Sequence, residues 1–205
     1  MKRQRFKLLG FAVVFGLLVF MLEIYDFLAI NLPVDGNILV VESWFWQSSA
    51  MKEAMEEFNH GHYKWLVTVG APIDYMNQKS SAEVAARRLR ELGVDESRII
   101  VLPVPDMKLH QTYTSAVTLR NWLIRSKTET TGVNVFTLGT HARKSLVLFR
   151  RALGPGTKVG VIAGTEDNFD ASRWWLSTRG IYWVSGRTFG YLYATFWPLP
   201  NERSG

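Results

Sequence analysis

Residues 38–42 read ILVVE and residues 65–69 read WLVTV. Both are short, continuous apolar runs rich in β-branched side chains, which is typical of strands buried on both faces of a parallel sheet. Three further runs of this kind follow, at residues 98–102, 133–138 and 158–162. Amphipathic helical patterns separate the runs. This alternation predicts an α/β domain with a mostly parallel sheet of about five strands and helices on both faces.

The predicted helices fill the gaps between these strands, at residues 48–59, 81–92, 113–126 and 141–153. Residues 170–197 follow the last strand, are rich in Trp, Tyr and Phe, and read as one interrupted helix or as two. Two interpretations of this aromatic segment stay open. It packs on the sheet, or it lies in a membrane interface beside the N-terminal segment.

The N-terminal segment is strongly apolar. Residues 8–22 contain no charged side chain, and Glu23 and Asp26 follow them. Crossing a bilayer takes about 20 residues, so both acids would lie at the outer interface, where an aromatic such as Tyr25 also fits. We therefore expect residues 8–30 to form a single transmembrane anchor.

The predicted organisation is a cytoplasmic basic tail and anchor over residues 1–30, a linker over residues 31–36, and an α/β domain over residues 37–205. Positive charge before the anchor and little after it places the N-terminus inside and the domain in the periplasm or outside the cell. A cleaved signal peptide is the alternative, although residues 28–30, Leu-Ala-Ile, are a poor cleavage site. The positive charges of the tail are Lys2, Arg3, Arg5 and Lys7.

Composition excludes several classes of function. The net charge is +6, but the basic tail supplies +4 of it, so the rest of the chain has too little excess charge to suggest nucleic-acid binding. The absence of cysteine excludes disulfides, iron–sulfur clusters and cysteine nucleophiles. No H-E-x-x-H, G-x-G-x-x-G, P-loop or G-x-S-x-G motif occurs, so we predict no metal site and identify no cofactor. The oligomeric state is not indicated.

Polar and glycine residues follow the predicted strands at their carboxyl ends. In open α/β sheets the ligand crevice lies there, so these residues should gather around one site. Trp44 follows the first strand, Gly70 ends the second, Thr112 precedes the helix after the third, and His141 and Lys144 follow the fourth.

The helix that begins near His141 carries Arg143 and Lys144 in its first turn, where the helix dipole is already positive. An anion held by the free N–H groups of that turn, with Arg143 as a bidentate clamp, would explain the two cations. His141 in that place is a natural general acid or base. The alternative is that both cations are solvated.

Glu83 and Thr112 also have structural interpretations. Ser80 and Glu83 have the spacing of a capping box, in which the glutamate returns to the backbone N–H of the serine. Thr112 stands where a helix N-cap is expected.

Four segments together resemble the SanA, ElyC and YdcF-like family of bacterial envelope proteins. They are a strand ending in glycine, Leu66–Gly70; the glutamate Glu83; a threonine-led helix start, Thr112–Ala116; and a histidine-led helix start, His141–Ser145. The resemblance spans residues 38–163. Thr114 and Ser115 stand in the threonine-led helix start where the family often has Glu and Asn, so the chain looks like a divergent member.

The resemblance implies a Rossmann-like domain with a polar cleft built around Glu83, Thr112, His141 and Arg143. It further implies a cell-envelope protein that binds or acts on a phosphate-bearing sugar, free or lipid-linked, in polysaccharide or peptidoglycan-precursor metabolism. A hydrolase or transferase with Glu83 and His141 exchanging protons is one form of this hypothesis, with Gly70, Thr112, Arg143, Lys144 and Trp44 contacting the ligand. A non-catalytic scaffold for envelope assembly and a binder of an S-adenosylmethionine-like ligand are the alternatives.

Overall fold

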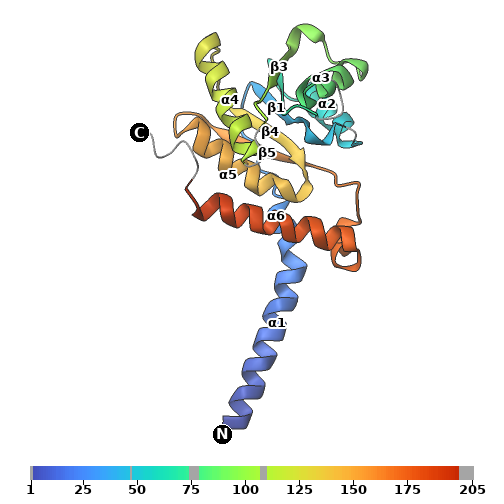
Figure 1. Cartoon of the computed structure of the whole chain (residues 1–205), viewed down its shortest axis with the longest axis vertical. Helices are drawn as coiled ribbons and strands as arrows, with labels where there is room; N and C mark the ends of the chain where they lie inside the picture. The colour runs from blue at the N-terminus through green and yellow to red at the C-terminus, as the bar shows by residue number, and fades with distance from the viewer. Residues whose placement is uncertain (1, 47, 74–78, 107–109, 199–205) are drawn as a thin grey trace.

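The computed structural model describes residues 2–46, 48–73, 79–106 and 110–198. Its centre is a five-stranded sheet in which every neighbouring pair is parallel, in the order β3-β2-β1-β4-β5. This arrangement is Rossmann-like and confirms the predicted fold class (Figure 1). The strands are β1 (Ile38–Glu42), β2 (Trp65–Gly70), β3 (Ile99–Pro103), β4 (Val133–Leu138) and β5 (Val159–Gly164).

Helices cover both faces of the sheet, as predicted, because alternate side chains of each strand point to opposite sides. In β1, Leu39 and Val41 belong to a core shared with α2 and α3, whereas Ile38 and Val40 belong to a core shared with α4 and α5. The helices are α1 (Lys2–Leu28), α2 (Ala50–His60), α3 (Ser81–Glu91), α4 (Gln111–Ser126), α5 (Ala142–Leu153) and α6 (Thr178–Phe196). Short 3-10 helices are η1 (Ser43–Phe45), η2 (Glu96–Arg98), η3 (Gly139–His141) and η4 (Ala171–Leu176).

The strand order reverses at β1. The chain proceeds from β1 to β2 and β3 on one side, and β4 and β5 then occupy the other side. The loops that leave the carboxyl ends of β1 and β4 therefore run in opposite directions. Open α/β sheets form a ligand crevice between such loops. This switch point positions the site described below.

The aromatic C-terminal segment forms η4 and α6. One face of α6 packs on α5, on η4 and on the last turn of α1. Ile24 and Leu28 of α1 are buried against Trp174 of η4 and Val184 of α6. The packing interpretation of this segment is thus correct for one face of α6.

Most of α1 extends away from the domain, while its last turn is held against it (Figure 1). In the portion of the chain that the structure describes, no helix combines the length and the apolar character that a membrane crossing requires. The membrane anchor expected over residues 8–30 stays a prediction.

The segment predicted as a linker over residues 31–36 is attached to the sheet. Leu32 pairs with Val161 of β5 through two backbone hydrogen bonds of 2.9 and 3.0 Å. The side-chain oxygen of Asn134 in β4 accepts the Val34 N–H at 2.8 Å, and its side-chain nitrogen donates to the Val34 carbonyl at 2.8 Å. Its amide also donates to the Tyr63 hydroxyl at 2.9 Å. The connection between α1 and the domain is therefore stiff.

Replacing Asn134 by alanine should lower the free energy of unfolding of the full-length protein by about 2–3 kcal/mol. The change leaves the buried backbone groups of Val34 and the Tyr63 hydroxyl without their partner, and each such loss costs about 1 kcal/mol or more. Urea denaturation followed by circular dichroism measures the effect. Asn121→Ala, an exposed position on α4, is the matched control and should change stability by less than about 0.5 kcal/mol. Equal effects of the two substitutions would contradict the role of Asn134.

Candidate functional site

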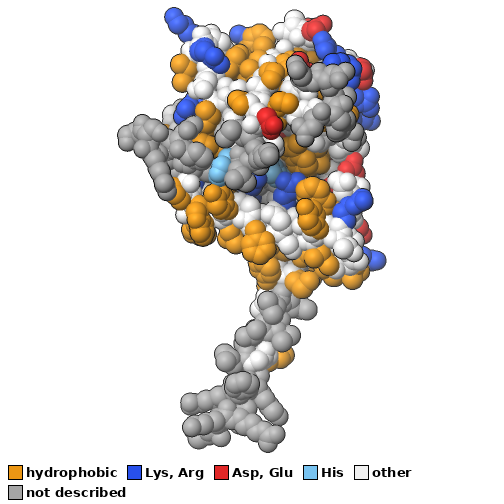
Figure 2. Space-filling view, in the orientation of Figure 1, with side chains coloured by type: hydrophobic (Ala, Val, Ile, Leu, Met, Phe, Trp, Pro, Cys, Tyr) orange, Lys and Arg blue, Asp and Glu red, His pale blue; other side chains and the backbone are white. Residues whose placement is uncertain are grey.

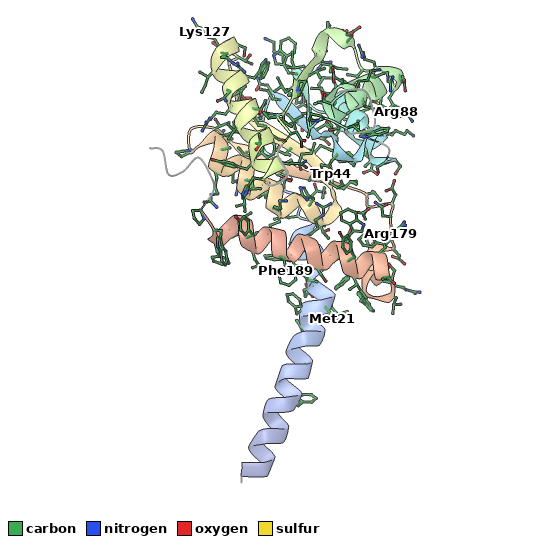
Figure 3. All side chains as sticks on the ribbon, viewed as in Figure 1. Met21, Trp44, Arg88, Lys127, Arg179 and Phe189 are labelled. Atoms are coloured by element: carbon green, nitrogen blue, oxygen red, sulfur yellow. The ribbon has the colours of Figure 1, made fainter. Side chains whose placement is uncertain are left out.

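A cavity of about 770 Å³ opens at the carboxyl ends of β1, β2 and β4, and α6 closes one side of it. Its volume is within the range of small-molecule sites, roughly 300–1,000 Å³. Trp44 lies between the sheet and α6 (Figure 3). The polar and aromatic side chains of the lining include Glu42, Trp44, Trp46, His110, Thr112, Ser115, His141, Lys144, Arg187 and Tyr193.

Glu42 is the last residue of β1, and its side chain turns into the cavity. The residue is only 3 % exposed. Ser145 of α5 donates its hydroxyl to Glu42 Oε2 at 2.5 Å. The same oxygen lies 3.8 Å from Nε2 of His141. The strand end thus presents a buried carboxyl group to the histidine at the start of α5.

His141 is held by groups on both of its ring nitrogens. The Thr112 hydroxyl oxygen lies 3.3 Å from Nε2, and the Arg187 guanidinium is hydrogen-bonded to Nδ1. A guanidinium can only donate, so Nδ1 must accept, and the neutral imidazole carries its proton on Nε2. We assign this tautomer from the hydrogen-bond pattern. It leaves His141 as a donor toward Thr112 and Glu42.

Arg187 reaches the cavity from α6 between two indole rings. Its guanidinium carbon lies 4.7 Å from the ring centroids of both Trp44 and Trp183. Such cation–π contacts stabilise a partly desolvated cation by about 1–2 kcal/mol and restrict its movement. The guanidinium is thereby fixed with one side toward His141.

Lys144 enters the cavity from the first turn of α5. Gly190 of α6 lies beside it, where an added Cβ atom would be in ordinary van der Waals contact with Lys144 Cδ at 3.4 Å. Among the described residues, no three histidine or acidic side chains are grouped so that they could hold a metal ion.

The cluster contains more positive than negative charge. Burial raises the pKa of Glu42, while the Ser145 hydrogen bond and the charges of Lys144 and Arg187 oppose the rise. Burial and the two cations lower the pKa of His141 well below its usual value, so the ring is neutral. Burial also lowers the pKa of Lys144, and the Glu42 carboxylate opposes this. Two cations facing one carboxyl group favour an anionic ligand.

Five of the predicted site residues line the cavity: Trp44, Gly70, Thr112, His141 and Lys144. Gly70 allows a close approach of α3, because a Cβ atom there would lie 2.0 Å from Ser81 Oγ and 2.9 Å from the Ala82 backbone nitrogen. Thr112 contacts His141 directly rather than capping α4, whose N-cap residue is His110. The structure brings these five residues together as expected.

Glu83 does not belong to this group. It is exposed on α3 and is not part of the cavity lining. Its carboxylate accepts the Ser80 N–H at 2.6 Å and the Ser80 hydroxyl at 2.8 Å, and these bonds lower its pKa. The capping-box interpretation is therefore correct, and the predicted pairing of Glu83 with His141 is not what the structure shows. Glu42 takes that place.

Arg143 also lies outside the cavity lining. Its guanidinium stacks on the Phe27 ring, with 3.9 Å from the guanidinium carbon to the ring centroid, and donates to the Phe27 carbonyl. Free carbonyls at the C-terminus of α1 and the negative end of its dipole attract a cation there. The predicted anion clamp is wrong for Arg143, which instead joins α1 to α5.

Glu42 and Arg187 are the two site residues that sequence reasoning missed. A glutamate closing an otherwise apolar strand was a usable signal, because a buried carboxyl group at the carboxyl end of a strand needs a partner. Arg187 had a weaker signal, as an isolated cation within an aromatic segment. Its partners come from η1, η3 and α6 itself, and only the folded chain brings them together.

His141 should make the protein less stable in weak acid. Because its pKa is lowered in the folded state, the unfolded chain takes up more protons below about pH 6.5, and stability falls there by up to about 1.4 kcal/mol per pH unit. His141→Gln, whose side-chain oxygen can accept from Arg187, should lose less stability between pH 7.5 and 5.5 than wild type does. Urea denaturation at the two pH values measures this.

The exposed His62→Gln is the matched control for that comparison and should keep the wild-type pH response. Glu42 is present in all three proteins, so its own contribution cancels in the differences. An unchanged pH response in His141→Gln would show that the histidine is not held neutral by its surroundings.

Comparisons of the chain with family models, with curated proteins and with solved structures return no match. The resemblance to the SanA, ElyC and YdcF-like family stays a prediction. The geometry of the site is therefore the basis on which a function can be proposed.

Proposed function

We propose that this chain is a membrane-anchored cell-envelope protein whose cavity binds the phosphate of a sugar phosphate. The observation that carries the proposal is the pair of cations, Lys144 and Arg187, in a cavity of ligand size whose described lining contains one carboxyl group, that of Glu42. The Glu166 carboxylate acts on Arg187 from outside that lining. A ligand phosphate would complete the charge balance of the cluster. Membership of the SanA, ElyC and YdcF-like family is part of the proposal.

The two cations suit a phosphate group in different ways. Arg187 offers a planar fork of donors that matches two phosphate oxygens, and the indole rings of Trp44 and Trp183 already hold it in place. Lys144 supplies a point charge from the start of α5. Aromatic side chains of the lining, Trp46 and Tyr193 among them, form the less polar walls that ligand sites generally have.

A chemical role follows from the neighbouring acid and base. Burial raises the pKa of Glu42, which favours a role for this carboxyl group in taking up and returning a proton. His141 orients that carboxyl group and acts as a donor, because Arg187 occupies its Nδ1 atom. Hydrolysis or transfer at the phosphate of an envelope precursor is the reaction class that this pair supports, with Glu42 in the role first expected of Glu83.

The proposed location rests on α1. Several of its described side chains, among them Phe11, Phe15 and Leu22, are apolar and more than half exposed. The uncharged run over residues 8–22 and the basic tail before it are typical of an anchor with a cytoplasmic N-terminus. In this topology the domain meets periplasmic or extracellular ligands. The excess positive charge of the cavity disfavours a cationic ligand such as S-adenosylmethionine.

Removing either cation should weaken the binding of a sugar phosphate. N-acetylglucosamine 1-phosphate added to full-length protein in detergent should change the fluorescence of the tryptophans that line the cavity. We expect Arg187→Met and Lys144→Met to raise the Kd about tenfold or more, since a charge-assisted hydrogen bond contributes about 1.5–3 kcal/mol.

Arg179→Met, on the exposed N-terminal turn of α6, is the matched control and should leave the Kd unchanged. N-acetylglucosamine without phosphate should bind far more weakly to the wild-type protein. Equal affinity for the sugar and its phosphate, or equal effects of the three substitutions, would count against a phosphate site.

Glu42→Gln separates binding from chemistry. The substitution keeps a hydrogen-bonding side chain beside Ser145 and removes a carboxylate that acts on both Lys144 and Arg187, so the sugar phosphate should bind more tightly. Turnover, measured as phosphate release from N-acetylglucosamine 1-phosphate, should be lost in the same variant. Glu83→Gln is the matched control and should change neither quantity. Turnover that persists in Glu42→Gln would remove its proton-transfer role, and wild-type binding without turnover would favour a non-catalytic binder.

A further inference from the structure

The outer face of α6 carries a series of large apolar side chains. We call this series the apolar stripe of α6. At 100° per residue its members fall on one side of the helix, opposite the buried Gly180, Val184 and Ala194. They are 40–72 % exposed and comprise Ile181, Tyr182, Phe189, Leu192 and Phe196.

No acidic residue occurs between residues 171 and 198. The charged side chains of this segment are all arginines, and Arg173 and Arg179 of these are exposed. Surface helices normally place charged residues opposite the face that packs on the core. Here that position is apolar and aromatic, so α6 presents an apolar face both to the domain and away from it.

The stripe faces a definite direction. In Figure 1, α6 runs crosswise over the end of α1, and the rest of α1 extends away on the side opposite the sheet. Figure 2 shows apolar side chains gathered along this lower edge of the domain. Tyr191, on the inner side of α6, meets Phe27 of α1 edge to face at 5.5 Å, which holds α1 beside α6. Farther along α1, the apolar side chains of Phe20 and Leu22 are exposed.

We propose that α6 lies in the surface of a lipid bilayer, with its apolar stripe buried at the boundary between headgroups and acyl chains. This inference rests on the membrane attachment proposed above for α1. A helix with Tyr, Phe, Leu and Ile on the lipid side and arginines nearby has the composition of interfacial helices, and anionic headgroups attract such cations. With α1 across the bilayer, the crosswise orientation places α6 along the membrane surface.

A second copy of the chain is the competing occupant. The position of the stripe argues against it, because α6 runs crosswise at the end of α1 and apolar side chains gather along the edge of the domain from which α1 leaves, so this edge meets lipid as soon as the anchor is inserted. The aromatic residues also match the composition that headgroup regions favour. The inference therefore commits to the bilayer.

This arrangement gives the cavity access to lipid-linked ligands. The face of α6 opposite the stripe lines the cavity through Arg187, Gly190 and Ala194. With the stripe in the membrane surface, Arg187 and Lys144 stand close to the level of lipid phosphates. A lipid-linked sugar phosphate would thus reach the cations while its tail stays in the bilayer.

Site-directed spin labelling tests the position of α6. The chain has no cysteine, so each single-cysteine variant takes one label. Phe189→Cys and Phe196→Cys mark the stripe, where both side chains are 71 % exposed and tolerate replacement. Arg88→Cys on α3 (Figure 3) is the matched control on the domain, and Phe15→Cys marks α1. The full-length variants are reconstituted in vesicles of phosphatidylethanolamine and phosphatidylglycerol.

The measurement is the collision rate of each label with oxygen, which concentrates in lipid, and with a water-soluble nickel chelate. Labels at positions 189 and 196 should collide more with oxygen than with nickel, and the label at position 88 should show the reverse. Nickel access at 189 and 196 equal to that at 88, with position 15 in lipid, would overturn the inference and leave the anchor intact. Shielding from both reagents with spin–spin broadening would overturn it in favour of a second copy.

The experiments distinguish a failure of the inference about α6 from a failure of the proposed function. Position 15 reports on the anchor by itself, and the sugar-phosphate titration in detergent reports on the cavity without a bilayer. If position 15 is accessible to nickel while positions 189 and 196 are in lipid, the anchor fails and the interfacial position of α6 stands. If all the labels are accessible to nickel, both membrane proposals fail and the phosphate site is still to be judged on its own titration.

Discussion

The carboxyl group of Glu42, buried at the end of the central strand, constrains the arrangement of the whole site. A buried carboxyl group needs hydrogen bonds and opposite charge, and here Ser145 supplies the former and two cations the latter. These partners come from α5 and α6, so the demand of one side chain ties three elements together. His141 joins the same network through Glu42 on one side and Arg187 on the other. The contacts that satisfy the Glu42 carboxyl group are therefore also the contacts that arrange the cavity.

The same elements attach α1 to the domain. Arg143 caps the C-terminal end of α1 one residue before Lys144 enters the cavity, and Ile24 and Leu28 bury themselves against η4 and α6. Adjacent side chains of α5 thus serve the anchor and the site. Because the segment that follows α1 is also hydrogen-bonded to β4 and β5, the direction of α1 relative to the cavity is set by the fold. Because this connection is stiff, the direction of α1 across a membrane would also set the orientation of α6 relative to that membrane.

The strands and most helices could be predicted because their signals are local. The apolar runs of β1 and β4 ended where the structure ends them, whereas β3 is shifted by one residue and β5 begins one residue later and ends two residues later than predicted. Strand ends depend on pairing with neighbours, which periodicity does not report. The site residues that follow strands were found for the same reason, since the carboxyl edge of a parallel sheet is a topological consequence of the strand pattern. Glu83 and Arg143 were misplaced because a pattern does not show which way a side chain turns.

By itself, the sequence determined the α/β class, the positions of the strands, and the gathering of Gly70, Thr112, His141 and Lys144 at one edge, because apolar periodicity and strand direction are local properties. Only the tertiary structure decided that Glu42 rather than Glu83 faces His141, and that Arg187 crosses from α6 to meet it. It also decided that Arg143 serves α1. These choices depend on which surfaces of distant elements come into contact, and burial then selects the partner for each charge.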